Sequence, residues 1–182
     1  MMDTAGFVEK LKLLGACDEA LEWVATQPDA ETAWETCPRY EWMTWLLRAL
    51  YFRGCVKSHT MALVAVHCAS KAASGIQEHE GCVHETLETV RKWVLNGVGL
   101  CEVREARDEA IRVSLLRPEP SLFNRAHRAA AEAAGVAICT DASYAMRRSI
   151  IWIENDCCVE DLIRDIVRWH NVEAWLGECE GR

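Results

Sequence analysis

The chain has 182 residues, of which 51% are hydrophobic and 26% charged, with 10 glycines and only 4 prolines. Collagen-like and low-complexity chains contain far more glycine and proline, and disordered chains contain fewer apolar residues. A membrane-spanning helix needs about 20 consecutive apolar residues, whereas the most apolar stretch, 61–69, is short and contains His67. The composition therefore predicts a single domain over residues 1–182, with no membrane span.

The formal net charge is −8, from 28 acidic and 20 basic residues, and the acidic excess lies at the two ends. Residues 1–36 contain 8 acidic and 2 basic residues (net −6), and residues 154–182 contain 8 and 3 (net −5). The middle, 37–153, contains 12 acidic and 15 basic residues (net +3). Because nonspecific nucleic-acid binding requires Lys and Arg to neutralise phosphates, we expect no direct nucleic-acid binding. Acidic ends favour a basic partner, although a plain solvated surface has the same composition.

Ten cysteines would suit a disulfide framework in a secreted protein. The first residues, MMDTAGFVEKLKLL, carry acids early and do not contain the apolar core of a secretory signal. We therefore expect a cytoplasmic protein whose thiols are reduced and pack as small hydrophobic side chains.

Apolar residues recur with a helical period of 3.6 along the chain. This pattern predicts an all-α fold, a single bundle of about nine helices joined by short connectors. We expect Gly15 to end the first helix, Asp18 to cap the second and Asp29 to cap the third.

The helices predicted further along the chain differ in how far each is expected to be buried. The helix that starts near Ser58 is apolar on nearly all sides and is expected to be central. A charged, exposed helix is predicted over 102–116, and an alanine-rich helix over 121–134 that Gly135 ends. The last helix is predicted to run without a break over 159–176.

A candidate metal site combines His79, Cys82 and His84 with His67 from the preceding helix. Imidazole and thiolate are good zinc ligands. Structural zinc sites usually have paired ligands, however, and no C-x-x-C occurs in the chain. The motifs G-x-S-x-G, H-E-x-x-H, G-x-x-x-x-G-K and G-x-G-x-x-G are also absent. We therefore predict no metal, no cofactor and no catalytic residue. A small metal-dependent or thiol enzyme that uses these four residues is the alternative.

Clusters of acidic residues and two tryptophans are the candidate partner-binding residues. Like charges three or four residues apart share one helix face and weaken the helix slightly. A surface that nevertheless carries them is a candidate for binding a basic partner. A solvated surface and a buried core are the ordinary interpretations of such acids and tryptophans. The candidate set is Asp18, Glu19, Glu22, Glu31, Glu35, Asp161, Asp165, Trp169 and Trp175.

Several segments carry a family resemblance. The run GACDEALEW over 15–23 is followed by Ala33-Trp34, Cys37-Pro38 and WMTWL over 42–46. This order resembles the opening of the Imm-5-type family of immunity proteins, which belongs to bacterial polymorphic toxin systems and also occurs in phage-borne genes. Segments 90–97, 102–107 and 161–164 resemble later helices of the family. The resemblance implies an all-helical fold with no cofactor and no catalytic residues.

The sequence thus predicts a non-enzymatic inhibitor that covers a basic surface of a protein partner with acidic helices. The partner would be a toxin nuclease, if the protein confers immunity. It would be a nucleic-acid-binding host defence complex, if the protein is a phage counter-defence or anti-CRISPR protein. A structural assembly subunit is a further alternative.

Overall fold

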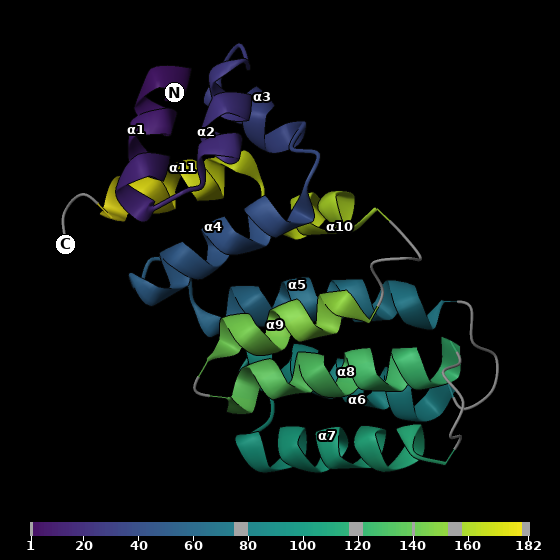
Figure 1. Cartoon of the computed structure of the whole chain (residues 1–182). Helices are drawn as coiled ribbons and strands as arrows, with labels where there is room; N and C mark the ends of the chain where they lie inside the picture. Colours follow the sequence, from purple (N-terminus) through teal and green to yellow (C-terminus); the bar gives the residue numbers. More distant parts are fainter. Residues whose placement is uncertain (1, 75–79, 117–121, 140, 153–157, 180–182) are drawn as a thin grey trace. The chain divides into compact units, whose positions relative to one another are not determined.

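The structure is a computed structural model that describes residues 2–74, 80–116, 122–139, 141–152 and 158–179. These residues form eleven α-helices and no strand (Figure 1), which confirms the all-α class with two helices more than expected. Among the described helices, none is long and apolar enough to cross a membrane.

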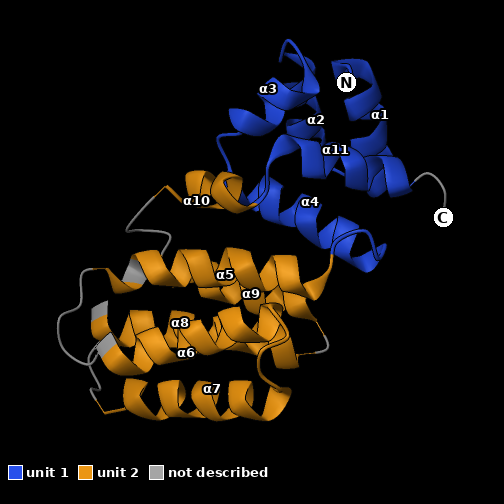
Figure 2. Ribbon diagram, turned by 180° about the vertical axis from the view of Figure 1, so that it is seen from behind, with its two compact units in different colours: residues 1–56, 167–182 blue, residues 57–166 orange. Residues whose placement is uncertain are grey.

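The helices fall into two compact units (Figure 2). Unit 1 comprises Met1–Val56 and Val167–Arg182, and unit 2 comprises Lys57–Ile166. Unit 1 is therefore built from two chain segments, with unit 2 between them in the sequence. Whether the two units together form the expected single bundle, and whether they unfold as one domain, stays a prediction.

Unit 1 contains five helices: α1 (Thr4–Leu14), α2 (Asp18–Ala25), α3 (Ala30–Glu35), α4 (Tyr40–Phe52) and α11 (Trp169–Glu178). Gly15 ends α1 with φ +84°, a left-handed conformation that glycine adopts without steric cost. The Asp29 carboxylate caps α3 by accepting a 2.7 Å hydrogen bond from Thr32 N. Both predictions are confirmed. Asp18, however, is the first helical residue of α2, and Cys17 occupies the cap position without a side-chain hydrogen bond.

Aromatic side chains hold the two chain segments of unit 1 together. The rings of Phe7 and Trp169 meet edge to face, with centroids 5.3 Å apart. Trp34 Nε1 donates a buried 3.0 Å hydrogen bond to Val167 O. Because a buried polar group without a partner is costly, this bond fixes the start of the C-terminal segment against α3.

The prediction of one unbroken helix over 159–176 is wrong. Helix α10 (Val159–Ile166) ends before Val167, and α11 begins at Trp169. Arg168 between them is extended, with φ −78° and ψ 153°. The carbonyl of Val167 accepts its hydrogen bond from Trp34. The break between α10 and α11 therefore coincides with a hydrogen bond from Trp34, which lies 133 positions before Val167.

Unit 2 contains α5 (Ser58–Ala73), α6 (Glu80–Val94), α7 (Leu100–Ser114), α8 (Leu122–Ile138), α9 (Ala142–Ile151) and α10. The backbones of α5, α7 and α9 run close to α8, and α5 also packs on α6, α9 and α10. Helix α5 is central, as predicted. Small side chains permit this close packing; the fully buried alanines of α8 are Ala126, Ala129, Ala130, Ala133 and Ala134.

The prediction that Gly135 ends the alanine-rich helix is wrong. Helix α8 continues to Ile138, and Gly135 is buried inside it. A Cβ at this position would lie 3.6 Å from Ala145 Cβ of α9. Helix α7 has an exposed charged face, as predicted, and a buried face that includes Val103, Ala110 and Val113.

Candidate partner-binding site

Helices α2 and α3 present the acidic residues of the N-terminal region to solvent. Residues 18–35 contain six acidic residues and no basic residue. Ala20 and Val24 of α2 and Trp34 of α3 are buried, so the acids lie on the opposite faces. We define the acidic surface as five exposed residues of these helices, Asp18, Glu19, Glu22, Glu31 and Glu35.

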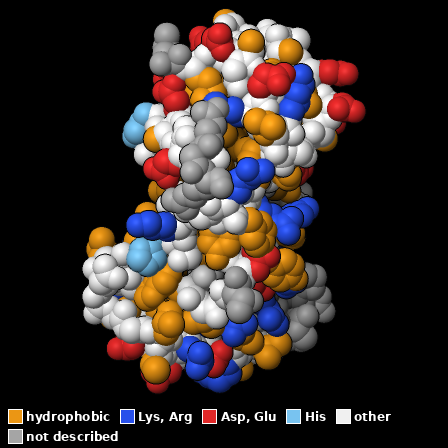
Figure 3. All heavy atoms as spheres, turned by 90° about the vertical axis from the view of Figure 1, so that its left-hand side faces the viewer, with side chains coloured by type: hydrophobic (Ala, Val, Ile, Leu, Met, Phe, Trp, Pro, Cys, Tyr) orange, Lys and Arg blue, Asp and Glu red, His pale blue; other side chains and the backbone are white. Residues whose placement is uncertain are grey.

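Most of this charge is not neutralised inside the protein. Glu19 forms an ion pair: Arg39 Nη2 lies 2.8 Å from Glu19 Oε1, and Arg39 Nη1 lies 2.9 Å from Oε2. Within the part of the chain that the structure describes, the carboxylates of the other four form no ion pair or hydrogen bond. Figure 3 shows several acidic side chains on the face of unit 1 that it presents. Four like charges without a counter-charge leave a negative potential for a partner to neutralise.

Arg39 connects the acidic surface to a group of tryptophans. Its guanidinium carbon lies 5.0 Å from the centroid of the Trp42 ring, within the range of a cation–π interaction. Trp42 in turn packs on Trp23 of α2, with centroids 5.8 Å apart and planes inclined by 47°. The exposed ion pair with Glu19 thus lies directly against aromatic side chains of α2 and α4.

These rings border an apolar cavity of about 40 Å³ inside unit 1. Trp23, Trp42 and Trp45 are partly exposed, whereas Trp34 and Met43 are buried. The cavity therefore reaches the surface at its three partly exposed tryptophans. We call it the tryptophan pocket; its lining is Phe7, Leu11, Ala16, Ala20, Trp23, Val24, Ala33, Trp34, Cys37, Trp42, Met43, Trp45 and Leu46.

The remaining candidate residues belong neither to the acidic surface nor to the lining of the tryptophan pocket. Trp169 is only 4% exposed and packs on Phe7, so it belongs to the core and is not a surface anchor. Trp175 of α11 is half-buried. Asp161 and Asp165 lie on α10 of unit 2, where Asp161 binds Arg164 at 2.7 Å and Asp165 Oδ2 lies 3.4 Å from His67 Nε2.

Sequence reasoning missed the tryptophan pocket. The helical spacing of Trp42 and Trp45 is typical of core residues, and Trp23 lies in the same aromatic-rich stretch. The available signal was density: four of the eight tryptophans lie between positions 23 and 45. More large rings than a small interior can enclose must line an opening or the surface.

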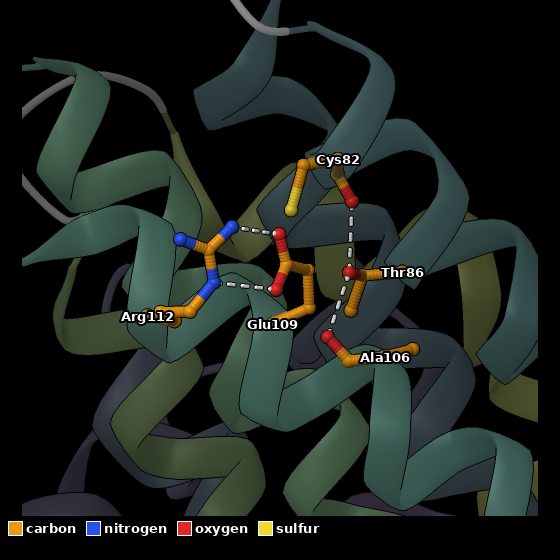
Figure 4. A network of polar contacts seen from close by, with 5 residues as sticks. All are labelled: Cys82, Thr86, Ala106, Glu109 and Arg112. Atoms are coloured by element: carbon orange, nitrogen blue, oxygen red, sulfur yellow. Dashed lines mark hydrogen bonds and ion pairs between the residues drawn. The ribbon is translucent and has the colours of Figure 1, made fainter. Parts of the chain in front are cut away.

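The residues of the metal or thiol alternative lie in unit 2, apart from His79, which is outside the described residues. The Cys82 thiol of α6 points toward the Glu109 carboxylate of α7 (Figure 4). Glu109 accepts hydrogen bonds of 2.8 and 2.5 Å from Arg112, which lower the pKa of this carboxyl. Burial, and then the negative charge of Glu109, raise the pKa of the Cys82 thiol. A raised pKa disfavours the thiolate, which is the form that attacks substrates and binds metals.

Thr86, near this thiol, and the two described histidines of the alternative offer no catalytic or metal-binding arrangement either. The Thr86 hydroxyl lies 2.8 Å from Cys82 O and 3.2 Å from Ala106 O. His84 is exposed, and His67 faces Asp165 without hydrogen-bond geometry. Among the described residues, no three His, Cys, Asp or Glu side chains lie close enough together to hold a metal ion.

Comparison of the chain with protein families, with curated proteins and with solved structures finds no match.

Proposed function

We propose that this protein is a non-enzymatic inhibitor that binds a protein partner through unit 1. The acidic surface covers a basic surface of the partner, and the tryptophan pocket receives an apolar side chain from it. The observation that carries the proposal is the juxtaposition of two features of unit 1. Four exposed carboxylates have no counter-charge among the described residues, and an apolar cavity rimmed by tryptophans lies in the same unit. The proposal keeps the cytoplasmic location expected from the sequence.

The two parts of the site contribute differently to binding. Complementary charge speeds association and rejects partners of the wrong sign, but exposed ion pairs add little affinity. Tryptophan, in contrast, is among the residues that most often dominate binding energy at interfaces. Affinity is therefore expected from the tryptophan pocket, and selection of a basic partner from the acidic surface.

Either biological setting suits this arrangement. A toxin nuclease and a nucleic-acid-binding defence complex both present Lys and Arg where they contact phosphates. Exposed carboxylates on α2 and α3 would take the place of those phosphates. An inhibitor bound over these Lys and Arg residues would prevent the partner from binding nucleic acid, and no chemical step is needed.

The test is capture of a partner, its identification by mass spectrometry and measurement of its affinity in purified form. One variant neutralises four carboxylates of the acidic surface: Asp18→Asn, Glu22→Gln, Glu31→Gln and Glu35→Gln. A matched control neutralises four exposed carboxylates of unit 2: Glu85→Gln, Glu102→Gln, Glu105→Gln and Asp108→Asn. Both variants change the net charge by the same amount.

We expect the first variant to weaken binding at least about tenfold at low salt and the control by less than about twofold. High salt should reduce the affinity of the wild type and bring it close to that of the first variant. Equal losses in both variants would mean that only net charge matters. An affinity that neither salt nor the first variant changes would refute the acidic surface as the binding site.

A further inference from the structure

Two cysteines from the two chain segments of unit 1 lie against each other. Cys55 Sγ and Cys179 Sγ are 2.7 Å apart, close enough for a hydrogen bond between thiols. Cys55 follows the end of α4, and Cys179 occupies the C-terminal cap of α11. A disulfide bond is about 2.05 Å long, so only a small approach of the two sulfurs is needed to form one.

We propose that Cys55 and Cys179 form a reversible disulfide that staples the C-terminal segment of unit 1 to its N-terminal segment. The two residues are 124 positions apart and enclose all of unit 2 in the sequence. A link across such a long loop restricts the unfolded chain strongly. The bond would stabilise unit 1 under oxidising conditions and be absent in a reducing compartment.

The two sulfurs differ in access, which sets the order of reaction. Cys55 is 6% exposed, whereas Cys179 is partly exposed. Cys179 lines a cavity of about 70 Å³ together with Lys10 and Arg53. The oxidant in this proposal is glutathione disulfide, a small diffusible disulfide. Cys179 is therefore the residue that meets the oxidant first.

The reaction is a pair of thiol–disulfide exchanges. The Cys179 thiol loses its proton, and the thiolate attacks one sulfur of glutathione disulfide and breaks its S–S bond. One glutathione leaves as a thiol, and Cys179 holds the other as a mixed disulfide. The Cys55 thiolate then attacks Cys179 Sγ and releases the second glutathione. The protein loses two protons and two electrons, and glutathione disulfide gains them to become two molecules of glutathione.

The link would reinforce contacts that already hold α11. Met2 N donates to Glu173 Oε1 at 2.6 Å, and Lys10 Nζ donates to Leu176 O at 3.2 Å. Both bonds are at most partly buried, so water can compete for them. A covalent bond at Cys179 keeps the end of α11 in place when these bonds open.

The experiment exposes the full chain to mixtures of reduced and oxidised glutathione, with intact mass and proteolytic peptide mapping as readouts. We expect a loss of about 2 Da and a peptide pair that joins Cys55 to Cys179. Cys55→Ser should stop at one glutathione on Cys179. The control Cys17→Ser, which removes an exposed thiol of unit 1, should form the link as the wild type does. Glutathione on other exposed cysteines while Cys55 and Cys179 stay reduced would overturn the proposal.

A second measurement tests the staple without relying on a variant. The thermal unfolding midpoint of the wild type is compared before oxidation, after oxidation and after a reductant is added back. We expect a rise that the reductant reverses. A mapped Cys55–Cys179 link with an unchanged midpoint would overturn the stapling role.

Discussion

The two units pack their interiors in opposite ways. Unit 1 contains six of the eight tryptophans, Trp23, Trp34, Trp42, Trp45, Trp169 and Trp175. Unit 2 is centred on α8, where six of the buried residues are alanines. Large rings fill the space between the helices of unit 1, whereas small side chains bring the helices around α8 close together in unit 2. Unit 1 is therefore sensitive to loss of volume, and unit 2 to added volume.

Charge divides the units as well. Unit 1 contains 12 acidic and 7 basic residues (net −5), and the larger unit 2 contains 16 and 13 (net −3). In unit 2, acidic residues of α7, α8 and α10 form ion pairs with nearby arginines. In unit 1, four of the five acidic-surface carboxylates have no ion-pair partner among the residues that the structure describes. This difference in charge supports the proposal that unit 1 binds the partner.

The largest effect is expected where unit 1 loses a ring. Trp34 is 2% exposed and donates to Val167 O. Trp34→Ala should reduce the free energy of unfolding by about 3–5 kcal/mol, measured by urea titration followed by circular dichroism. Trp175→Ala, at a half-buried position, should cost clearly less. Equal costs at both positions would show that the interior of unit 1 does not depend on Trp34.

Overpacking should be the weak point of unit 2. Ala133 is fully buried in α8, and a leucine there must displace neighbouring helices. Ala133→Leu is expected to cost about 1–3 kcal/mol in the same titration. Ala25→Leu, on an exposed position of α2, serves as the control and should have little effect. A neutral Ala133→Leu would show that α8 is not closely packed.

Replacing two glycines by alanine should change the free energy of unfolding in opposite directions. Gly15 has φ +84° at the end of α1, so Gly15→Ala is expected to cost about 1 kcal/mol or more. Gly135 lies within α8, and an added Cβ makes an ordinary 3.6 Å contact with Ala145. Gly135→Ala should therefore stabilise unit 2 by about 0.5–1 kcal/mol. Destabilisation by both changes would mean that α8 and α9 are too close to admit a methyl group.

The smallest expected effect is on the pH dependence of stability, through the N-terminal cap of α3. The hydrogen bond from Thr32 N lowers the pKa of Asp29 below its ordinary value of 3.8. A lowered pKa in the folded state means that Asp29 stabilises the protein above pH 3.8 and loses this contribution as the pH falls through the lowered pKa. The wild type should thus be more stable than Asp29→Asn at neutral pH, with the difference vanishing in acid. A difference that persists at the lowest pH would contradict the role of the charge.

Features that depend on a few neighbouring residues can be predicted from the sequence, whereas features that depend on contacts between distant segments cannot. Gly15 and Asp29 act within a few residues, so their roles could be read correctly. Gly135 has the same residue type as Gly15, but burial against α9 keeps it inside a helix. The break at Val167 accompanies a hydrogen bond from Trp34, 133 positions earlier, which no local pattern contains.

The candidate site divides in the same way. Exposed acids could be predicted because their spacing and lack of basic neighbours are visible in the sequence. Helical periodicity cannot separate a ring in a closed core from one at the rim of a cavity. Trp169, a candidate for partner binding, is therefore found in the core, whereas Trp42 borders the tryptophan pocket. The pairing of Cys55 with Cys179 depends on how the two segments of unit 1 meet.

The most direct test of the account is amide hydrogen exchange on the complex with the captured partner, compared with the protein alone. Binding should slow exchange in α2, α3 and the first turns of α4, which carry the acidic surface and the rim of the tryptophan pocket. Helices α6 and α7 should exchange as they do in the unbound protein. Slowed exchange on α6 and α7 with no change on α2 and α3 would contradict the assignment of recognition to unit 1.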